Sequence, residues 1–239
     1  MKAMLLAAGF GTRLKPFTEH HPKALAEVNG KSLLQHNIEY LQQFGIYDVV
    51  VNVHHFAEQI IQAIKNNDGW GSRVSVSDET DAILETGGGL RRAAWFFKDE
   101  EDFVLMNVDV LTDLHLNEMI AFHKKNKPLA TLATTNRETS RYFLFNEAGI
   151  LCGWENIKTG EKKIMRHENN LIPKAFSGLH ILSTKIFPFM QQPEIKFSMV
   201  DVYLSLCAGH SILSYNHSGS KFIDVGKPES LQRAQTLFK

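Results

Sequence analysis

Hydrophobic positions along the chain form short unbroken runs that alternate with segments of helical spacing. The clearest runs cover residues 3–8, 49–53 and 103–106. Strands buried on both faces of a parallel sheet have this continuous apolar character, and the runs have the length of strands. Helical patterns lie between them, so the order of elements predicts a layered α/β fold with a mostly parallel central sheet.

One segment shows the helical pattern in full. Residues 33–44 place Leu34, Ile38 and Leu41 at helical spacing and end before Gly45, a residue type favoured just past a helix end. The other expected elements follow from the same two periodicities. They are helices over residues 56–64, 90–97, 114–124, 200–207 and 228–238 and strands over residues 73–77, 129–134, 176–182 and 221–224.

The spacing changes between about residues 137 and 174. Short alternating pieces are interrupted there by Gly149, Gly160 and Pro173, which is typical of hairpins rather than of strand–helix–strand units. We therefore predict one domain over residues 1–239. It is a Rossmann-like three-layer α/β sandwich whose central sheet is mostly parallel, with a small antiparallel insert over about residues 137–174.

Composition limits the partners of this domain. With 239 residues, 44% of them hydrophobic, the chain is long enough to bury one sizeable core. Lys and Arg total 26 and so do Asp and Glu, so no net positive field exists that would hold a nucleic acid. We expect any recognition of phosphate to depend on a local site.

Cysteine usage and the N-terminal segment indicate a cytoplasmic location. Cys152 and Cys207 have neither CxxC nor metal-ligand spacing, and a disulfide framework would need more cysteines. The apolar run at residues 3–8 ends at Gly9 and is too short for a signal peptide or a membrane span. We therefore expect neither export nor membrane association.

A glycine-containing loop follows the first apolar run. It reads Gly9-Phe10-Gly11-Thr12-Arg13, and Pro22-Lys23-Ala24-Leu25 comes shortly after it. Glycines let backbone N–H groups approach an anion without a Cβ in the way, so such a loop can cradle phosphate oxygens. Arg13 and Lys23 would supply positive charge beside it.

Two familiar phosphate loops do not fit this segment. A dinucleotide-binding fingerprint needs a third glycine where Leu14 stands, and a carboxylate after the second strand, where the chain reads Asn52-Val53-His54. The tripeptide Gly30-Lys31-Ser32 imitates the end of a P-loop, but Leu25 occupies the position of the leading glycine. We interpret that tripeptide as a turn before a helix.

The two segments together resemble the signature of the sugar-phosphate nucleotidyltransferase family, G-x-G-x-R followed by P-K-x-L. Four further segments extend the resemblance over nearly the whole chain. They are Leu84-Glu85-Thr86-Gly87-Gly88-Gly89, Asn107-Val108-Asp109, Phe176-Ser177-Gly178 and Phe222-Ile223-Asp224-Val225-Gly226-Lys227-Pro228. The version of the glycine segment and the short length resemble bacterial N-acetylmuramic acid 1-phosphate uridylyltransferases and mannose or heptose 1-phosphate guanylyltransferases.

The resemblance implies a reaction and a nucleotide site. The expected substrates are a nucleoside triphosphate, UTP or GTP, and a sugar 1-phosphate, and the products are a nucleotide sugar and pyrophosphate. In the family, the loop holds the triphosphate, the signature arginine contacts the β- and γ-phosphates, and the signature lysine contacts the reacting phosphate. These roles fall on Ala8, Gly9, Gly11 and Thr12 for the loop, and on Arg13 and Lys23.

The resemblance also implies metal and sugar ligands. Asp109 and Asp224 each end an apolar strand and would bind one Mg²⁺, a hard cation that takes few carboxylates and leaves sites for phosphate oxygens. The expected base and ribose contacts are Glu79, Thr86, Gly87 and Gly88. The expected sugar contacts are Phe176, Gly178 and Asp201, with the insert lining the sugar pocket.

Structural roles compete with these assignments. Asp109, Asp201 and Asp224 could instead cap the helices that follow them, which is a common use of Asp. The insert reads Glu161-Lys162-Lys163-Ile164, without the E-x-K-P motif of glucose 1-phosphate thymidylyl- and uridylyltransferases, so those subclasses and the sugar contacts are less well supported.

Two other functions stay open at this stage. One is a catalytically silent paralogue that binds a nucleotide sugar and regulates a partner. The other is nucleotidyl transfer to a non-sugar phosphate such as choline phosphate. The sequence also leaves the assembly open between a monomer and a small homo-oligomer.

Overall fold

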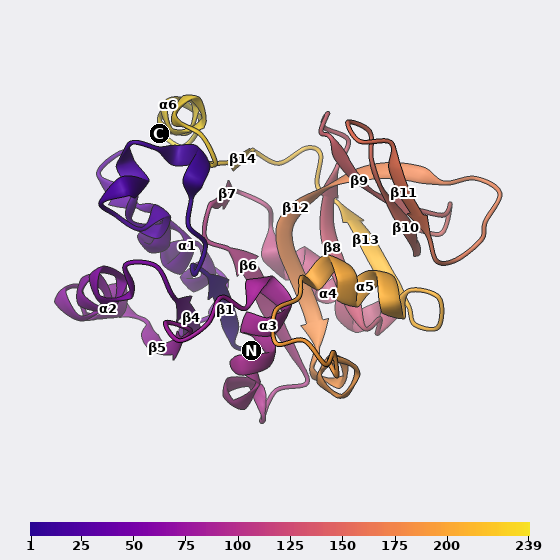
Figure 1. Ribbon diagram of the computed structural model, residues 1–239, viewed down its shortest axis with the longest axis horizontal. Helices are drawn as coiled ribbons and strands as arrows, with labels where there is room; N and C mark the ends of the chain where they lie inside the picture. Colours follow the sequence, from indigo (N-terminus) through magenta and orange to yellow (C-terminus); the bar gives the residue numbers. More distant parts are fainter.

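A parallel sheet forms the first half of the protein in the computed structural model, which describes residues 1–239. Its central strand is β1 (Ala3–Leu6), which pairs in parallel with β4 (Asp48–Val53) on one side and with β6 (Asp102–Asn107) on the other. Strand β5 (Arg73–Asp78) continues the parallel arrangement beyond β4. The carboxyl ends of β1, β4 and β6 therefore share one edge of the sheet (Figure 1).

The long strand β12 (Ile172–Ser183) joins this sheet to the rest of the chain. It pairs antiparallel with β6 and with β8 (Ala130–Thr135), and β13 (Ile212–Asn216) lies parallel to β8. The amino-terminal part of β12 pairs with β9, which continues into the antiparallel strands of the insert. The insert strands are β9 (Arg141–Phe145), β10 (Leu151–Asn156) and β11 (Glu161–Ile164). The predicted α/β fold, mostly parallel at its centre and with an antiparallel insert, is confirmed.

Helices cover both faces of the sheet, because alternate residues of each strand point to opposite sides. Ala3 and Leu5 of β1 face one core, whereas Met4 faces the other. Figure 1 shows α3 and α5 in front of the sheet and α4 behind it. The helices of the first core are α1 (Leu33–Gln42), α2 (Ala57–Asn66) and α4 (Leu116–Asn126), and those of the second are α3 (Glu85–Arg92) and α5 (Met199–Leu206).

A third, smaller core lies beneath the glycine loop. The closing helix α6 (Pro228–Leu237) packs Ala234 against Leu14 and Val28 there. The turn predicted around Gly30 joins two short strands, and Ser32 then caps α1 by accepting from the Gln35 N–H. No helix of the protein combines the length and the apolarity that a membrane crossing requires.

One element boundary differs from the prediction in a way that matters for the site. The helix expected at residues 90–97 begins earlier, at Glu85, and gives way to a 3₁₀ turn at Ala94–Phe97. Three consecutive glycines are poor helix formers, so propensity alone favours a loop there. Close packing against neighbouring segments outweighs that preference.

Candidate active site

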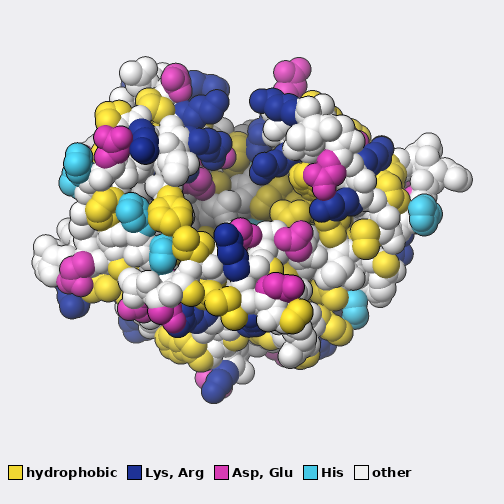
Figure 2. Space-filling model, in the orientation of Figure 1, with side chains coloured by type: hydrophobic (Ala, Val, Ile, Leu, Met, Phe, Trp, Pro, Cys, Tyr) yellow, Lys and Arg dark blue, Asp and Glu magenta, His cyan; other side chains and the backbone are white.

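A cavity of about 470 Å³ opens at the carboxyl ends of β1, β4 and β6. This is where ligands bind in open α/β sheets. Figure 2 shows a hollow in the middle of this face, with Lys and Arg side chains on both sides of it. Many of the residues predicted from sequence line the cavity: Ala8, Gly9, Gly11, Thr12, Arg13, Lys23, Glu79, Thr86 and Asp109.

The conformation of the loop depends on Gly11. Its φ of +62° is unfavourable for a residue with a side chain, and a Cβ there would lie 2.9 Å from Cβ of Lys23 and 2.9 Å from Cγ2 of Thr18. The Thr18 hydroxyl also donates to the Gly11 carbonyl at 3.0 Å. Gly11 therefore lets the loop pack directly against the segment that carries Lys23.

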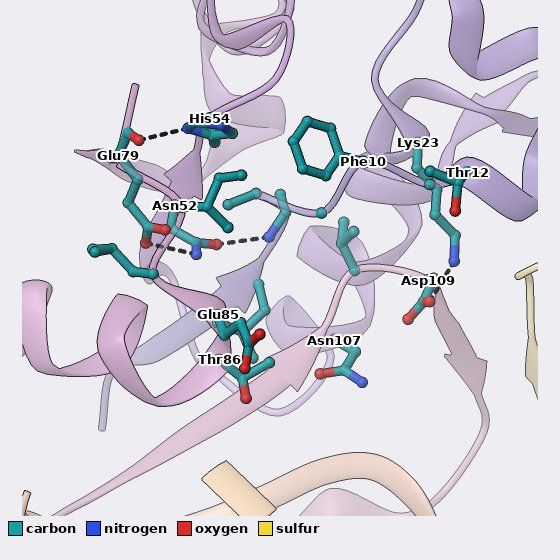
Figure 3. A pocket seen from close by; sticks show the side chains of 18 of the residues that line it. Phe10, Thr12, Lys23, Asn52, His54, Glu79, Glu85, Thr86, Asn107 and Asp109 are labelled. Carbon is teal, nitrogen blue, oxygen red and sulfur yellow. Dashed lines mark hydrogen bonds and ion pairs between the residues drawn. The ribbon is translucent and has the colours of Figure 1, made fainter. Parts of the chain in front are cut away.

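Lys23 and Asp109 meet inside the cavity. Lys23 is only 9% exposed, and its ammonium forms an ion pair with Oδ2 of Asp109. Asp109 is the second residue after Asn107, the last residue of β6, so the end of a central strand positions the carboxylate. Figure 3 shows this pair on one side of the cavity and Asn52 with Glu79 on the other.

Asp224 lies beside Asp109 because two short strands pair. Strand β14 (Phe222–Asp224) runs antiparallel to β7 (Val110–Thr112), and the N–H of Val225 donates to the Asp109 carbonyl at 2.8 Å. Asp224 is exposed overall, yet nearby protein atoms desolvate its carboxylate enough to raise its pKa. The negative charge of Asp109 raises that pKa further.

Arg13 approaches the same carboxylate. A Cβ at Gly226 would lie 2.8 Å from Oδ1 of Asp224 and 3.0 Å from Nη2 of Arg13, so both groups surround this glycine. Two cations and two carboxylates thus converge from four separate segments. Neither Asp109 nor Asp224 caps a helix, since the residues that precede α4 and α6 are His115 and Lys227.

This donor set suits a hard divalent cation. No group of three or more His, Cys, Asp or Glu residues forms a metal cage anywhere in the protein. Mg²⁺ usually takes only one or two carboxylates and completes its shell with water and phosphate oxygens. Asp109 and Asp224 fit that pattern, and the repulsion that raises the Asp224 pKa would be relieved by a cation between them.

The opposite side of the cavity contains a buried polar pair of Glu79, which was expected there, and Asn52, which was not. Oδ1 of Asn52 accepts from the Ala7 N–H at 2.7 Å, and its Nδ2 donates to Oε1 of Glu79 at 2.8 Å. Glu79 is 1% exposed, and burial raises its pKa. His54 contacts the Glu79 carbonyl through Nδ1 at 2.6 Å. In the sequence, Asn52 could have been noticed as a polar residue near the end of an otherwise apolar strand.

Gly87 and Gly88 do not line the cavity, contrary to expectation. Their N–H groups donate to the Phe197 carbonyl at 2.9 and 3.2 Å. A Cβ on Gly87 would lie 2.5 Å from Cδ2 of Phe197, and one on Gly88 would lie 2.3 Å from the Ile195 carbonyl oxygen. These glycines allow α3 to pack against the segment before α5, so they are not free to contact a nucleotide base.

The family model for nucleotidyl transferases matches residues 2–238. The chain belongs to the nucleotidyl transferase family. It is 29% identical over its whole length to a mannose-1-phosphate guanyltransferase of Yarrowia lipolytica, of which it spans 64%. It is 27% identical to an N-acetylmuramate α-1-phosphate uridylyltransferase of Caulobacter vibrioides, covering 98% of this chain and 95% of that protein.

Solved structures agree with the fold of this nucleotidyl transferase. HddC from Yersinia pseudotuberculosis, crystallised with GMP-PN, superposes with a TM-score of 0.78 at 23% identity, covering 100% of this chain and 99% of that one. A putative glucose-1-phosphate thymidylyltransferase from Bacillus anthracis gives a TM-score of 0.84 at 18% identity, covering 99% and 94%. At these identities, the likeness supports the architecture alone.

The residues expected to contact a sugar lie outside this cavity. Gly178 has a φ of +71° within an irregular stretch of β12, and a Cβ there would lie 2.8 Å from Nδ2 of Asn107, which does line the cavity. The ring of Phe176 lies 4.6 Å from that of His180. Gly178 thus lets β12 pass close to the end of β6.

Asp201 of this nucleotidyl transferase has a different role from the predicted one. It forms a capping box at the start of α5, in which its carboxylate accepts from the Ser198 hydroxyl at 2.6 Å and the Asp201 N–H donates to that hydroxyl at 3.2 Å. The structure therefore shows the capping role for Asp201, since the start of a helix favours a carboxylate on its own.

The lysines of the insert do not reach the cavity either. Lys162 and Lys163 lie exposed on the outermost strand β11, where they form ion pairs with Glu155 at 3.4 Å and Glu161 at 3.2 Å. Any positive charge that this nucleotidyl transferase offers to a second substrate must come from another position.

Proposed function

We propose that this protein joins a nucleoside triphosphate to a sugar 1-phosphate, producing a nucleotide sugar and pyrophosphate with the help of Mg²⁺. The observation that carries the proposal is the convergence of Arg13, Lys23 and Asp109 at the cavity that the glycine loop lines, with Asp224 beside Asp109. The relatives named above for guanylyl and uridylyl transfer support the same reaction class.

In this proposal, the chain binds and orients phosphate groups and contributes no nucleophile. Backbone N–H groups around Gly9 and Gly11 hold the triphosphate, and Arg13 neutralises its outer phosphates. A phosphate oxygen of the acceptor attacks the α-phosphorus, a new P–O bond forms, and the bond to the bridging oxygen breaks, releasing pyrophosphate. Positioning in line and charge stabilisation supply most of the acceleration of such a transfer.

Lys23 and the two aspartates act at the reacting phosphate. The ammonium of Lys23, which is paired with Asp109 in the structure, would turn to a phosphate oxygen when the triphosphate enters. Asp109 and Asp224 would then hold Mg²⁺. When bound, Mg²⁺ neutralises the α-phosphate and aligns it for attack.

We further propose that the nucleotide is UTP or GTP. The buried pair of Asn52 and Glu79 lies across the cavity from Lys23, and in this proposal the base lies beside it. Oε1 of Glu79 already accepts from Asn52, which leaves the second carboxylate oxygen as an acceptor. Uracil offers one ring N–H and guanine offers N1–H and an amino group, so both bases can donate to it.

The remaining parts of the proposal concern the acceptor and the setting. Residues of the insert, about 137–174, would line the acceptor pocket. Both cysteines are free and buried, which suits a reducing compartment such as the cytoplasm. The protein would act there as a monomer or a small homo-oligomer.

A substrate matrix tests the proposal directly. The purified protein is mixed with each NTP and with mannose 1-phosphate, N-acetylmuramic acid 1-phosphate or choline phosphate, and pyrophosphate release is followed with Mg²⁺ or with EDTA. We expect turnover with UTP or GTP, one sugar 1-phosphate and Mg²⁺ only. Turnover with choline phosphate alone would change the acceptor, and tight nucleotide binding without any pyrophosphate would indicate a silent regulatory protein.

A further inference from the structure

Arg137 lies near Asp224, although no motif in the sequence singles it out. It comes two residues after β8, at the start of the insert. Its Nη2 donates to the Phe176 carbonyl at 2.8 Å, and its guanidinium carbon lies 5.1 Å from the centre of the Phe222 ring. Phe222 and Asp224 both lie on the short strand β14. One strand therefore carries both the ring that packs against Arg137 and the Asp224 carboxylate.

The polar groups of Arg137 are only partly used. Its Nε–H is buried without a hydrogen-bond partner, and Asp224 acts on the guanidinium through charge without a hydrogen bond. Burial lowers the pKa of this side chain, because removing the guanidinium cation from water costs free energy. Its Nη1 group makes no hydrogen bond within the protein and is not among the buried atoms, so this end of the guanidinium is open to an anion.

His217 is a second underused group at the same place. Its Nε2 lies 2.8 Å from the Ser177 hydroxyl, whereas its Nδ1 is buried without a partner. The ring centres of His217 and Phe222 are 5.8 Å apart, so His217 and Arg137 share this neighbour. Burial and the charge of Arg137 lower the pKa of His217 to about 4, so it adds no positive charge at neutral pH.

Arg13 and Arg137 approach Asp224 from different parts of the chain. Arg13 comes from the glycine loop and lines the nucleotide cavity, whereas Arg137 comes from β8 and does not line it. The charges of both arginines act on the pKa of Asp224. Strand β12 is antiparallel to both β6 and β8, so β6 and β8 point the same way and bring Asp109 and Arg137 to one edge of the sheet.

We propose that Arg137 binds the phosphate group of the acceptor and places it beside the two aspartates, opposite the triphosphate. This inference rests on the proposed function, because that reaction brings two anionic substrates to one pair of carboxylates. Arg13 and Lys23 belong to the cavity of the first anion, and the exposed, paired lysines of β11 serve neither. A phosphate monoester matches the planar fork of a guanidinium, which can donate two parallel hydrogen bonds.

Two substitutions at this position and one control test the assignment. Arg137→Met removes the cation and keeps an apolar contact with Phe222, and Arg137→Lys keeps the charge but loses the fork. Arg233→Met removes an exposed arginine of α6, outside the insert and the cavity, and serves as the control. We expect Arg137→Met to raise the KM for the acceptor more than about tenfold while the KM for the NTP changes less than about twofold, since the variant loses the charge-assisted hydrogen bonds to the acceptor phosphate. The KM values of Arg137→Lys should fall between those of the wild type and Arg137→Met, and Arg233→Met should behave as wild type.

Calorimetric binding separates this assignment from the proposed reaction. Mannose 1-phosphate and N-acetylmuramic acid 1-phosphate are titrated into the wild-type protein and into each variant, so that no turnover is needed. If the wild-type protein binds an acceptor but releases no pyrophosphate with any NTP, the proposed reaction is wrong. The role of Arg137 in acceptor binding is then still decided by comparing the variants. Unchanged acceptor affinity in Arg137→Met, an equal rise of both KM values, or no acceptor binding by the wild type would overturn the role of Arg137.

Discussion

Lys23 and Asp109 form an ion pair that joins segments 86 positions apart in the sequence. The side chains are 10% and 20% exposed, so both charges have lost much of their hydration. A pair in such a place adds little to stability, because desolvation offsets most of the attraction. Its position at the reaction centre suggests instead that it keeps a cation and a metal ligand ready for a phosphate.

The first prediction concerns Asp109. Asp109→Asn keeps the size of the side chain but removes the negative charge that would bind Mg²⁺ and face Lys23. We expect pyrophosphate release to fall by at least about 100-fold at saturating Mg²⁺, the order of loss typical of removing a group that stabilises developing charge. Turnover is measured under the best conditions of the substrate matrix.

Asp99→Asn provides the matched control, because Asp99 is exposed and lies away from the cavity. It should keep wild-type turnover. A thermal melt of both variants shows whether either has lost its fold. Wild-type turnover in a folded Asp109→Asn variant would remove this carboxylate from the metal site.

The second prediction concerns the buried pair at the base end of the cavity. A Cβ on Gly89 would lie 2.6 Å from Oε1 of Glu79 and 2.9 Å from Nδ2 of Asn52, closer than real Cβ contacts. Gly89→Ala should displace these side chains and raise the KM for the NTP by about tenfold, the equivalent of one lost hydrogen bond of 1.4 kcal/mol.

Gly209→Ala is the control for that change, since a Cβ there meets nothing within 4 Å. It should leave the KM for the NTP unaltered. The acceptor KM of Gly89→Ala should also stay close to wild type. A large loss of acceptor affinity with normal NTP affinity would place the base elsewhere in the cavity.

The glycine loop was predictable because its determinants are local. Gly11, Arg13 and Lys23 lie within 13 positions of one another in the sequence, and their residue types express the chemistry directly. The nearness of Asp109 and Asp224 was also predicted, but the reasoning holds only for Asp109, which comes after a strand of the central sheet. Asp224 ends β14, which pairs with β7 in a separate two-stranded sheet. The antiparallel insert followed from the change in spacing after residue 137.

Other parts depend on long-range packing that a single sequence does not express. Gly87 and Gly88 suggested backbone that reads a ligand, yet their small size accommodates Phe197, more than 100 positions later. Arg137 shows no motif, and its position depends on β8, β12 and β14 coming together. Helix and strand propensities and the spacing of apolar residues do not show which distant segment packs against a given residue.

The third prediction tests the corrected role of Asp201. Asp201→Ala removes one half of the capping box and a negative charge at the amino end of α5. It should lower the free energy of unfolding by about 0.5–1 kcal/mol. It should leave the acceptor KM unaltered. Urea unfolding and acceptor titration measure the two effects, and a raised acceptor KM with normal stability would restore Asp201 to the sugar site.

The last prediction concerns pH and the buried His180. Burial lowers its pKa to about 3, and its Nδ1 lies 2.6 Å from the hydroxyl of Tyr203. In the unfolded chain the imidazole takes up a proton below about pH 6.5, whereas in the folded protein it stays neutral. The unfolded state therefore binds more protons in this range, and stability falls as the pH is lowered from 6.5 towards 3.

By pH 5 this one group should cost about 2 kcal/mol of stability relative to pH 7. His180→Asn keeps a polar atom for Tyr203 but does not titrate, so it should lose about that much less than wild type between the two pH values. Urea unfolding at pH 7 and pH 5 gives the comparison, and the other titrating groups, common to both proteins, cancel in it. Equal losses in the two proteins would mean that His180 becomes protonated in the folded state, and that water reaches the core between β12 and α5.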